Sequence, residues 1–499
     1  MPMNNKKKKR TSAKKKGKSK KNLHLHKSAD DLLSDGDAAL HTQDTDHAIA
    51  LYSAAIDKVQ KIPTESQGAT AGSSSLSNEQ QQDTLSDPTG NSTTVSLSDL
   101  TLLVSAFEKR AHAHVSLSHQ DEALNDYQAA LNALTQLVES RQLMASDENN
   151  NTAGGSGEDM QIEGVSSQEK VTLEQDENNL PDLWEQKAAL YLYIGQLKEG
   201  TEALEVYKQG IACLQEAMGL RERASAKLSQ NGASSDPSFA LHETRKQLAA
   251  AYCTISELYL TDLCFEEHAE RECDSFVSLA LRLTHEDYND GEPIVDALQA
   301  ATNLGLSQKR GLEAVDFILR AYRQMQKGCE ALASLVGVRE ASDPEQAIEL
   351  MEHESVQQLP GFEFRCQTAK LLLECAAILK EQPAGNDEDP RRSQCLQAAI
   401  DVLGSLLAEN DEVVEIWYLT GEAFAAMNTE SMVEAAHYWT RAKTMLEAVQ
   451  QSLEQEVMEA TEEAEEEDLQ RHLDEVTCQL EEVVSKLESC GATNDDIGE

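Results

Sequence analysis

Residues 48–55 read Ala-Ile-Ala-Leu-Tyr-Ser-Ala-Ala. Four later stretches repeat the same spacing of an alanine, a large residue four positions on, and a small residue three further. Offsets of four and seven place these side chains on one helical face, where small residues admit a second helix and the large one fills the gap. The sets are Ala48, Tyr52 and Ala55; Ala123, Tyr127 and Ala130; Ala203, Tyr207 and Gly210; Ala314, Ile318 and Ala321; and Ala435, Trp439 and Ala442. Such a chain is built to hold another molecule.

Recurring helix pairs predict an all-α fold. The spacing is typical of the second helix of a tetratricopeptide-type repeat, a helical hairpin that stacks on its neighbours into a superhelix. Leu298 precedes Ala314 by the sixteen residues expected between the markers of the two helices, and Gln43 and Asp44 are expected to form the turn of the first hairpin. We therefore predict a tetratricopeptide-like superhelix of about seven hairpins with disordered tails and insertions.

Polar stretches divide this array. Segments rich in Ser, Thr, Gln, Asn or acidic residues lack the apolar side chains that a packed core needs, so we expect them to be disordered. The division is 1–27 for a basic disordered tail, 28–62 and 99–140 for the N-terminal repeats, 63–98 for a disordered insertion, 141–179 for a disordered acidic insertion, 180–445 for the central and C-terminal repeats, 446–490 for an acidic capping helix and 491–499 for a disordered end. Within the sixth hairpin, residues 382–392 are expected to form a loop.

The predicted capping helix carries an amphipathic stripe. Its apolar residues step by four and three, as one face of a helix does. A terminal repeat needs a cap with a polar outer face, whereas a coiled coil with another chain would have only about three heptads here. Both interpretations remain, the cap being preferred. The stripe consists of Leu469, Leu473, Val476, Leu480, Val483 and Leu487.

The charge of the chain is divided unequally. The net charge is −45, yet residues 1–27 hold twelve Lys or Arg and no acid, which leaves −57 on residues 28–499. So acidic a body repels nucleic acids and membrane phosphates and attracts basic polypeptides. We therefore expect a cationic protein as the partner, with no membrane association and no tight nucleic-acid binding. A monomer that binds one partner is the expected stoichiometry.

Composition argues for a soluble intracellular protein without redox or metal chemistry. No apolar run approaches the roughly 18 residues of a membrane span, and the basic N-terminus lacks the hydrophobic stretch of a secretory signal. The ten cysteines form no C-x-x-C pair and are interpreted as small core residues of a reducing compartment. The histidines at 24 and 26, and those at 112, 114 and 119, lack carboxylate or thiol partners at ligand spacing. We expect no metal and no cofactor.

Signatures of catalysis are missing from the sequence. It contains no H-E-x-x-H, G-x-S-x-G, phosphate-binding or dinucleotide-binding motif. The basic tail, in contrast, fits nuclear import or contact with RNA, the simplest alternative being a solubilising tail. Import is preferred because an acidic body disfavours tight RNA binding. The proposed import signal consists of Lys6, Lys7, Lys8, Lys9, Arg10, Lys14, Lys15 and Lys16.

The expected inner helices are acidic. Tetratricopeptide domains that grip the acidic C-termini of heat-shock chaperones line their groove with Lys, Asn and Arg, but here the matching positions are acidic or neutral. An acidic groove would instead draw in Lys- and Arg-rich segments. Tyr259 and Tyr418 are candidate apolar anchors within it. The candidate client-binding residues are Asp182, Glu185, Glu257, Tyr259, Asp262, Glu266, Asp296, Glu363, Glu415, Tyr418 and Glu422.

Three short stretches resemble one family within this repeat class. They are 257–263 (Glu-Leu-Tyr-Leu-Thr-Asp-Leu) with Ala-Glu at 269–270, 362–365 (Phe-Glu-Phe-Arg) with Ala-Lys-Leu-Leu at 369–372, and 414–421 (Val-Glu-Ile-Trp-Tyr-Leu-Thr-Gly). Together with the Lys-rich start, this ordered set resembles the fungal dedicated assembly chaperones of large-subunit ribosomal protein L4.

The resemblance implies a function as well as a fold. It implies a chaperone that captures newly made L4, shields its basic internal loop and accompanies it from the cytoplasm to the nucleus for large-subunit assembly, with an import receptor as a further partner. The insertions at 63–98 and 141–179 depart from the family's compact pattern. An acidic nuclear scaffold or histone-type chaperone is the alternative, and no feature of the sequence supports a catalytic role.

Overall fold

Helices make up almost the whole of the described structure. The computed structural model describes residues 27–60, 96–152, 180–231, 238–283, 292–340, 353–381, 389–460 and 463–490. Within these ranges there is no β-strand, and no helix is long and apolar enough to cross a membrane. The all-α class is confirmed. Of the segments predicted as disordered at 1–27, 63–98, 141–179 and 491–499, residues 1–26, 63–95, 153–179 and 491–499 lie outside the described residues, including the lysines of the import signal. The prediction was wrong for residues 97–98, which begin helix α4.

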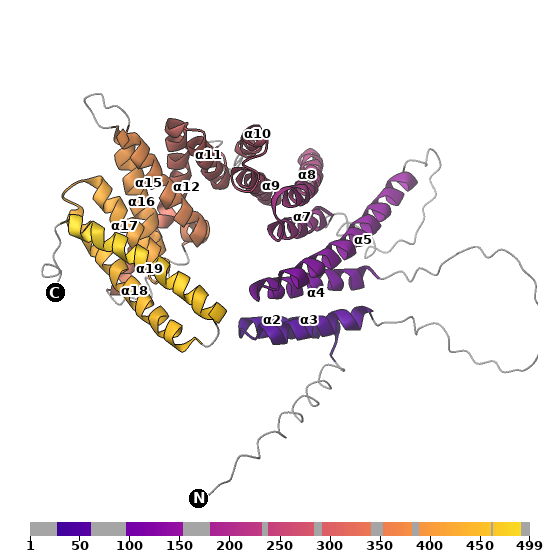
Figure 1. The fold of residues 1–499 in the computed structure, drawn as a ribbon. Helices are drawn as coiled ribbons and strands as arrows, with labels where there is room; N and C mark the ends of the chain where they lie inside the picture. Colours follow the sequence, from indigo (N-terminus) through magenta and orange to yellow (C-terminus); the bar gives the residue numbers. More distant parts are fainter. Residues whose placement is uncertain are drawn as a thin grey trace, which may run out of the picture. The chain divides into compact units, whose positions relative to one another are not determined.

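The described helices form seven consecutive pairs (Figure 1). The pairs are α2 (Ala29–His41) with α3 (Thr45–Gln60), α4 (Leu97–Ser116) with α5 (Gln120–Thr152), α7 (Leu180–Gln196) with α8 (Gly200–Asn231), α9 (Ser238–Leu260) with α10 (Ala269–Arg282), α11 (Val295–Ser307) with α12 (Gly311–Glu340), α15 (Phe362–Glu381) with α16 (Pro390–Glu409), and α17 (Val414–Met427) with α18 (Met432–Glu459). The short α14 (Glu354–Gln357) precedes α15, and α19 (Glu463–Ser489) follows the last pair. The tetratricopeptide-like hairpin class is confirmed.

The chain divides within α9 into two compact units, Met1–Ala251 and Tyr252–Glu499. In the first unit, one core joins α2 and α3 to α4, and a second joins α4 and α5 to α7. In the second unit, one core runs through α11, α12, α15, α16 and α17. Within each unit, neighbouring hairpins therefore bury their apolar faces in a shared core, as expected for stacked repeats.

The five triplets that predicted the repeats are all buried in the cores. Ala48, Ala123, Ala314 and Ala435 are fully buried, and so is Ala203 at 1% exposure. The large central residues are buried as well, with exposures of 0% for Tyr52 and Ile318, 2% for Tyr127 and Trp439, and 6% for Tyr207. The prediction from spacing is confirmed, because the burial pattern follows the helical period.

Glycines of three first helices lie directly against the large residue of the second helix. A Cβ at the glycine would come within 2.4 Å of the facing ring in each case. The absence of a side chain is thus what allows the two helices to approach so closely. The facing pairs are Gly36 with Tyr52, Gly195 with Tyr207, and Gly421 with Trp439.

We expect Gly195→Ala to destabilise the first unit by about 1 to 2 kcal/mol. The added Cβ must displace the Tyr207 ring, and overpacking of this kind costs about 1 to 3 kcal/mol, more than the helix propensity of alanine returns. Gly219→Ala in α8 is the matched control, since its Cβ would meet nothing within 4 Å. It should stabilise by up to about 1 kcal/mol. Urea unfolding followed by circular dichroism measures both, and the same sign for both variants would contradict the packing argument.

Three hairpins turn through the same backbone conformation. Gln43, Ser118 and Lys309 each have φ of 60°, the left-handed region that helices often adopt where they end. In the first hairpin the amide of Gln43 donates to Leu40 O at 2.9 Å and that of Asp44 to Ala39 O at 3.0 Å. These bonds satisfy carbonyls at the helix end and confirm the predicted turn at Gln43 and Asp44.

Several second helices extend beyond the predicted hairpins. α5, α8, α12 and α18 contain 33, 32, 30 and 28 residues. α5 therefore runs through residues 141–152, so the prediction of a disordered insertion starting at 141 was wrong. Residues 141–152 contain neither proline nor glycine, and extending an existing helix is far easier than nucleating one.

The sixth hairpin also differs from its prediction. α16 begins at Pro390, inside the loop expected at 382–392. The Asp389 carboxylate accepts a hydrogen bond from the amide of Arg391 at 2.9 Å and caps the helix. Proline is favoured at the first helical position because it lacks the N–H that would go unpaired there. The sequence Asp-Pro therefore starts the helix rather than continuing the loop.

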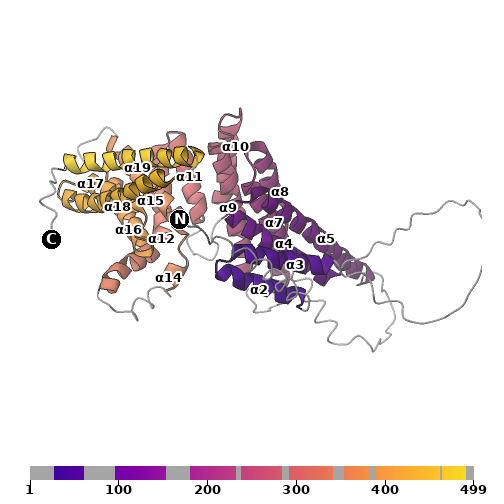
Figure 2. The same ribbon diagram turned by 60° about the horizontal axis from the view of Figure 1, so that its bottom comes forward.

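The C-terminal segment forms two helices rather than the single one predicted over 446–490. α18 continues to Glu459, and α19 returns along it (Figure 2). The side-chain amide of Gln450 donates from Nε2 to Thr477 Oγ1 at 3.1 Å. Val483 and Leu487 are buried in one cluster with Trp439. α19 therefore covers the apolar side of the last hairpin, as a capping helix does.

Candidate functional site

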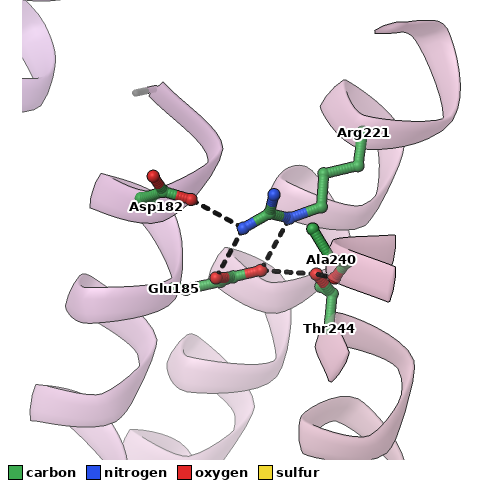
Figure 3. A network of polar contacts seen from close by, with 5 residues as sticks. All are labelled: Asp182, Glu185, Arg221, Ala240 and Thr244. Carbon is green, nitrogen blue, oxygen red and sulfur yellow. Dashed lines mark hydrogen bonds and ion pairs between the residues drawn. The ribbon is translucent and has the colours of Figure 1, made fainter. Parts of the chain in front are cut away.

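Two of the predicted acidic residues belong to a network that joins three helices (Figure 3). Arg221 of α8 donates two hydrogen bonds to the Glu185 carboxylate of α7, one from Nε to Oε1 at 2.9 Å and one from Nη2 to Oε2 at 2.8 Å. The same Nη2 lies 2.7 Å from Asp182 Oδ1. From α9, the Thr244 hydroxyl donates to the Glu185 carboxylate and lies 2.9 Å from the carbonyl oxygen of Ala240. The network ties the third hairpin to the helix that follows.

The two carboxylates of this network stabilise the charge of Arg221. Burial opposes the charge on Arg221, but hydrogen bonds and attraction from Glu185 and Asp182 outweigh it and raise the pKa of Arg221 overall. The side chains of Arg221 and Glu185 are 17% and 18% exposed. The charge of Glu185 is therefore compensated by Arg221 within the fold, and this carboxylate is not free to bind a partner. Asp182 is 59% exposed and is shared between Arg221 and solvent.

Three further predicted residues are engaged near the C-terminus. Glu415 pairs with Lys370 of α15 at 2.8 Å, and Glu422 pairs with Lys486 of α19 at 2.7 Å. The Tyr418 hydroxyl donates to a Glu482 oxygen of α19, and burial together with this bond raises the pKa of Tyr418. Side chains of α19 thus bind both Tyr418 and Glu422 within the fold. Tyr418 is half-buried and already hydrogen-bonded within the fold, and its role as an apolar anchor stays a prediction.

The other proposed anchor, Tyr259, is buried in the fold. Tyr259 is 9% exposed and stacks on Phe276 of α10, with ring centroids 6.3 Å apart and 19° between the planes. Its ring fills the space between α9 and α10, as the large residue of a hairpin does. The run Leu-Tyr-Leu at 258–260 does not tell a groove-facing tyrosine from a core one. Tyr259 lies in the core, which disfavours the prediction of this side chain as an anchor.

The remaining predicted acids lie nearer the surface, all in the second unit. Glu257, Asp262, Glu266 and Glu363 are exposed, and Asp296 is half-buried. Burial and then the charges of Asp296 and Glu257 raise the pKa of Cys253, so these two acids lie close to the same thiol. Burial raises the pKa of Cys366, Lys370 opposes this increase, and the charges of Glu415 and Glu363 add to it, so these two acids also lie close to one thiol. Carboxylates from different helices therefore gather at two places.

One exposed side chain was absent from the sequence-based candidates. Phe265 lies in the turn between α9 and α10 and is 97% exposed. It stands within the stretch Leu-Cys-Phe-Glu-Glu at 263–267, outside the helical period of its neighbours. A phenylalanine that matches no core position and is followed by two acids is the signal that could have identified it.

The described residues form no metal-binding cluster, and three of the buried thiols have raised pKa values. No group of three or more His, Cys, Asp or Glu in the described ranges is arranged to hold a metal ion. Six of the ten cysteines are buried. Burial raises the pKa of Cys213 to about 11 and those of Cys273 and Cys395 to about 12. Because the thiolate is the nucleophile, these thiols are inert near neutral pH and act as packing residues.

Comparison with known proteins places the chain beside assembly chaperones. No family model matches it. A curated protein of Schizosaccharomyces pombe (strain 972 / ATCC 24843), named "Probable assembly chaperone of rpl4", is 25% identical over 232 residues, which are 46% of this chain and 50% of that protein. The chain thus matches about half the length of this relative. The resemblance indicated by the three short stretches is confirmed.

Solved structures give weaker likenesses. The one described as "Assembly Chaperone of RpL4 (Acl4) (Residues 1-338)" has a TM-score of 0.44 and 18% identity, and covers 82% of this chain and 100% of that one. The one described as "The hypoxic regulator of sterol synthesis Nro1 is a nuclear import adaptor" has a TM-score of 0.36 and 10% identity, and covers 75% and 93%.

Proposed function

We propose that this chain is a non-catalytic chaperone that captures newly made large-subunit ribosomal protein L4, shields it and accompanies it into the nucleus for ribosome assembly. The observation that carries the proposal is the 232-residue sequence match to a protein named as an assembly chaperone of rpl4. The charge of −57 on residues 28–499 supports it, because a ribosomal protein is rich in Lys and Arg.

Capture in this proposal combines attraction with packing. The exposed carboxylates Glu257, Asp262, Glu266 and Glu363 attract client Lys and Arg that would otherwise bind RNA promiscuously. Repulsion between the acidic body and ribosomal RNA prevents stray contacts, and the proper RNA site of the client competes for its release. The acids already paired with Arg221, Lys370 and Lys486 stabilise the scaffold that presents this surface.

The basic tail completes the proposal. Its lysine clusters are assigned to nuclear import through an import receptor, so that the chaperone is present in both cytoplasm and nucleus. We further propose one chain per client, with neither a membrane nor a nucleic acid as a tight partner. The import assignment rests on the charge pattern of residues 1–27, which hold twelve Lys or Arg and no acid, and the exclusion of membranes and nucleic acids rests on the charge of −57 on residues 28–499.

Binding of the purified chain to purified L4 tests the proposal. We expect a stoichiometric complex by size-exclusion chromatography, with an affinity that falls at least about tenfold between about 0.05 M and 0.3 M salt because surface attractions are screened. Core histones, which are equally cationic, serve as the matched control. Failure to bind L4, or affinity for L4 that salt leaves unchanged, would contradict the proposal. Equal affinity for histones would favour the general acidic scaffold instead.

A further inference from the structure

The turn between α9 and α10 is well ordered although it lies at the surface. The amide of Leu263 donates to Leu258 O, that of Glu266 to Leu263 O, and that of Ala269 to Glu266 O, each at 3.0 Å. The Leu263 side chain is 5% exposed and anchors the turn in the core. The backbone that carries Phe265 is therefore held in place from both sides, which limits the entropy that a partner must overcome on binding.

Phe265 is held out into solvent by this ordered turn. At 97%, it is the most exposed large apolar side chain in the described part of the chain, and the next are Met458 at 79% and Val433 at 78%. The other phenylalanines whose side chains are described are half-buried. Single exposed aliphatic residues are common, but a rigidly presented aromatic ring is the kind of side chain that anchors protein interfaces.

The surroundings of this ring are strongly negative. Residues 257–270 contain five acidic residues and no Lys or Arg. Glu270 accepts a bond from Gln308 at 3.1 Å, which leaves its charge in place. The nearest cation along the chain, Arg271, is paired with Glu272 at 3.1 Å. The turn therefore combines an apolar anchor with the carboxylates of Glu266 and Glu267, which are exposed and form no ion pair within the described part of the chain.

We propose that this turn, residues 261–268, is a docking site for a Lys- and Arg-rich segment of the client, with Phe265 as its anchor. The aliphatic stem or cationic head of a client Lys or Arg packs on the ring, and Glu266 and Glu267 pair with the flanking cations. Charge complementarity favours this occupant. An acidic segment would be repelled, and a purely apolar segment would leave the carboxylates without partners. The inference rests on the proposed function and names the contact that carries it.

Phe265→Ala tests the anchor with purified L4 as the probe. We expect the affinity to fall at least about 30-fold, the lower bound of an interface hot spot, with an unchanged thermal midpoint because the ring makes no core contact. Met458→Ala is the matched control, since Met458 is the next most exposed large apolar residue of the described chain at 79% and is flanked by Glu456 and Glu459. It should change the affinity less than about twofold. A variant with both Glu266→Gln and Glu267→Gln should reduce the salt dependence of binding.

Two exposed thiols allow a second readout on the unmutated chain. Cys264 and Cys478 are both exposed, so both should be alkylated quickly in the free protein. Saturating L4 should slow alkylation of Cys264 by at least about tenfold and leave Cys478 unchanged, as mass spectrometry of the tryptic peptides would record.

The outcomes separate this inference from the proposed function. If the unmutated chain does not bind L4, both fail. If it binds, but Phe265→Ala binds equally well and Cys264 is not protected, only the docking site is overturned. A loss with Met458→Ala as large as that with Phe265→Ala would also overturn it, since any exposed apolar residue among acids would then suffice.

Discussion

Replacing Trp439 by alanine is expected to lower the free energy of unfolding by about 3 to 5 kcal/mol, the usual cost of removing a fully buried tryptophan. Its side chain is 2% exposed and fills the space between α17, α18 and α19. The indole N–H has no acceptor among the described residues, so the loss is one of packing and of the contact with the Lys486 ammonium, 5.9 Å from the ring centroid. Urea unfolding followed by circular dichroism measures the change.

A double-mutant cycle makes this prediction specific. Gly421 lies so close that its Cβ would come within 2.4 Å of Trp439 Nε1. Gly421→Ala should therefore destabilise the unmutated chain by about 1 to 2 kcal/mol, yet stabilise the Trp439→Ala variant, where the added methyl group enters the vacated space and alanine favours the helix. Additive effects of the two substitutions would show that the ring and the glycine are not in contact.

Replacing Arg365 by alanine is expected to cost about 3 kcal/mol, the lower end for breaking a buried charged pair. The guanidinium is 3% exposed. It donates from Nε to Pro360 O at 3.0 Å, from Nη1 to Ser405 Oγ at 2.9 Å, and from Nη2 to the Glu409 carboxylate. Truncation leaves the Pro360 carbonyl and Glu409 without their donor. The lower end applies because the Glu409 side chain is 44% exposed and can regain water.

Two variants test whether the geometry of Arg365 matters. Arg365→Lys should restore less than half of the lost free energy, because an ammonium on a flexible stem cannot reach three partners in fixed directions. Arg471→Ala is the surface control, since Arg471 and Asp468 are 75% and 74% exposed in their ion pair. It should change the unfolding free energy by less than about 0.5 kcal/mol. A comparable loss in both alanine variants, measured by the same urea unfolding, would refute the buried network.

The helical hairpins could be predicted well because their signal is local. Burial of Ala48, Tyr52 and Ala55 follows from offsets of four and seven residues, which any helix converts into one face. Helix ends were predicted less well. The chain beyond residue 140 is polar, and polarity was interpreted as disorder, but α5 continues to Thr152 because no residue there stops a helix that already exists.

The candidate site could be predicted only in part. The acidic character of the surface follows from composition, and Glu257, Asp262, Glu266 and Glu363 are indeed exposed. Which acids are already neutralised could not be seen. Arg221 lies 36 residues from Glu185 in the sequence and pairs with it only through the packing of α7 on α8. Phe265 was passed over because exposure of a single side chain in a turn leaves no periodic signal.

The sequence by itself determined the class of fold, the number of hairpins and the separation of a basic tail from an acidic body. These depend on residue spacing and on sums of charge, which need no coordinates. Only the tertiary structure decided that Tyr259 is buried, that Tyr418 is bonded to α19, that α19 covers the last hairpin, and that Phe265 is presented to solvent. The physical reason is that availability for binding depends on which side chains from distant segments become neighbours.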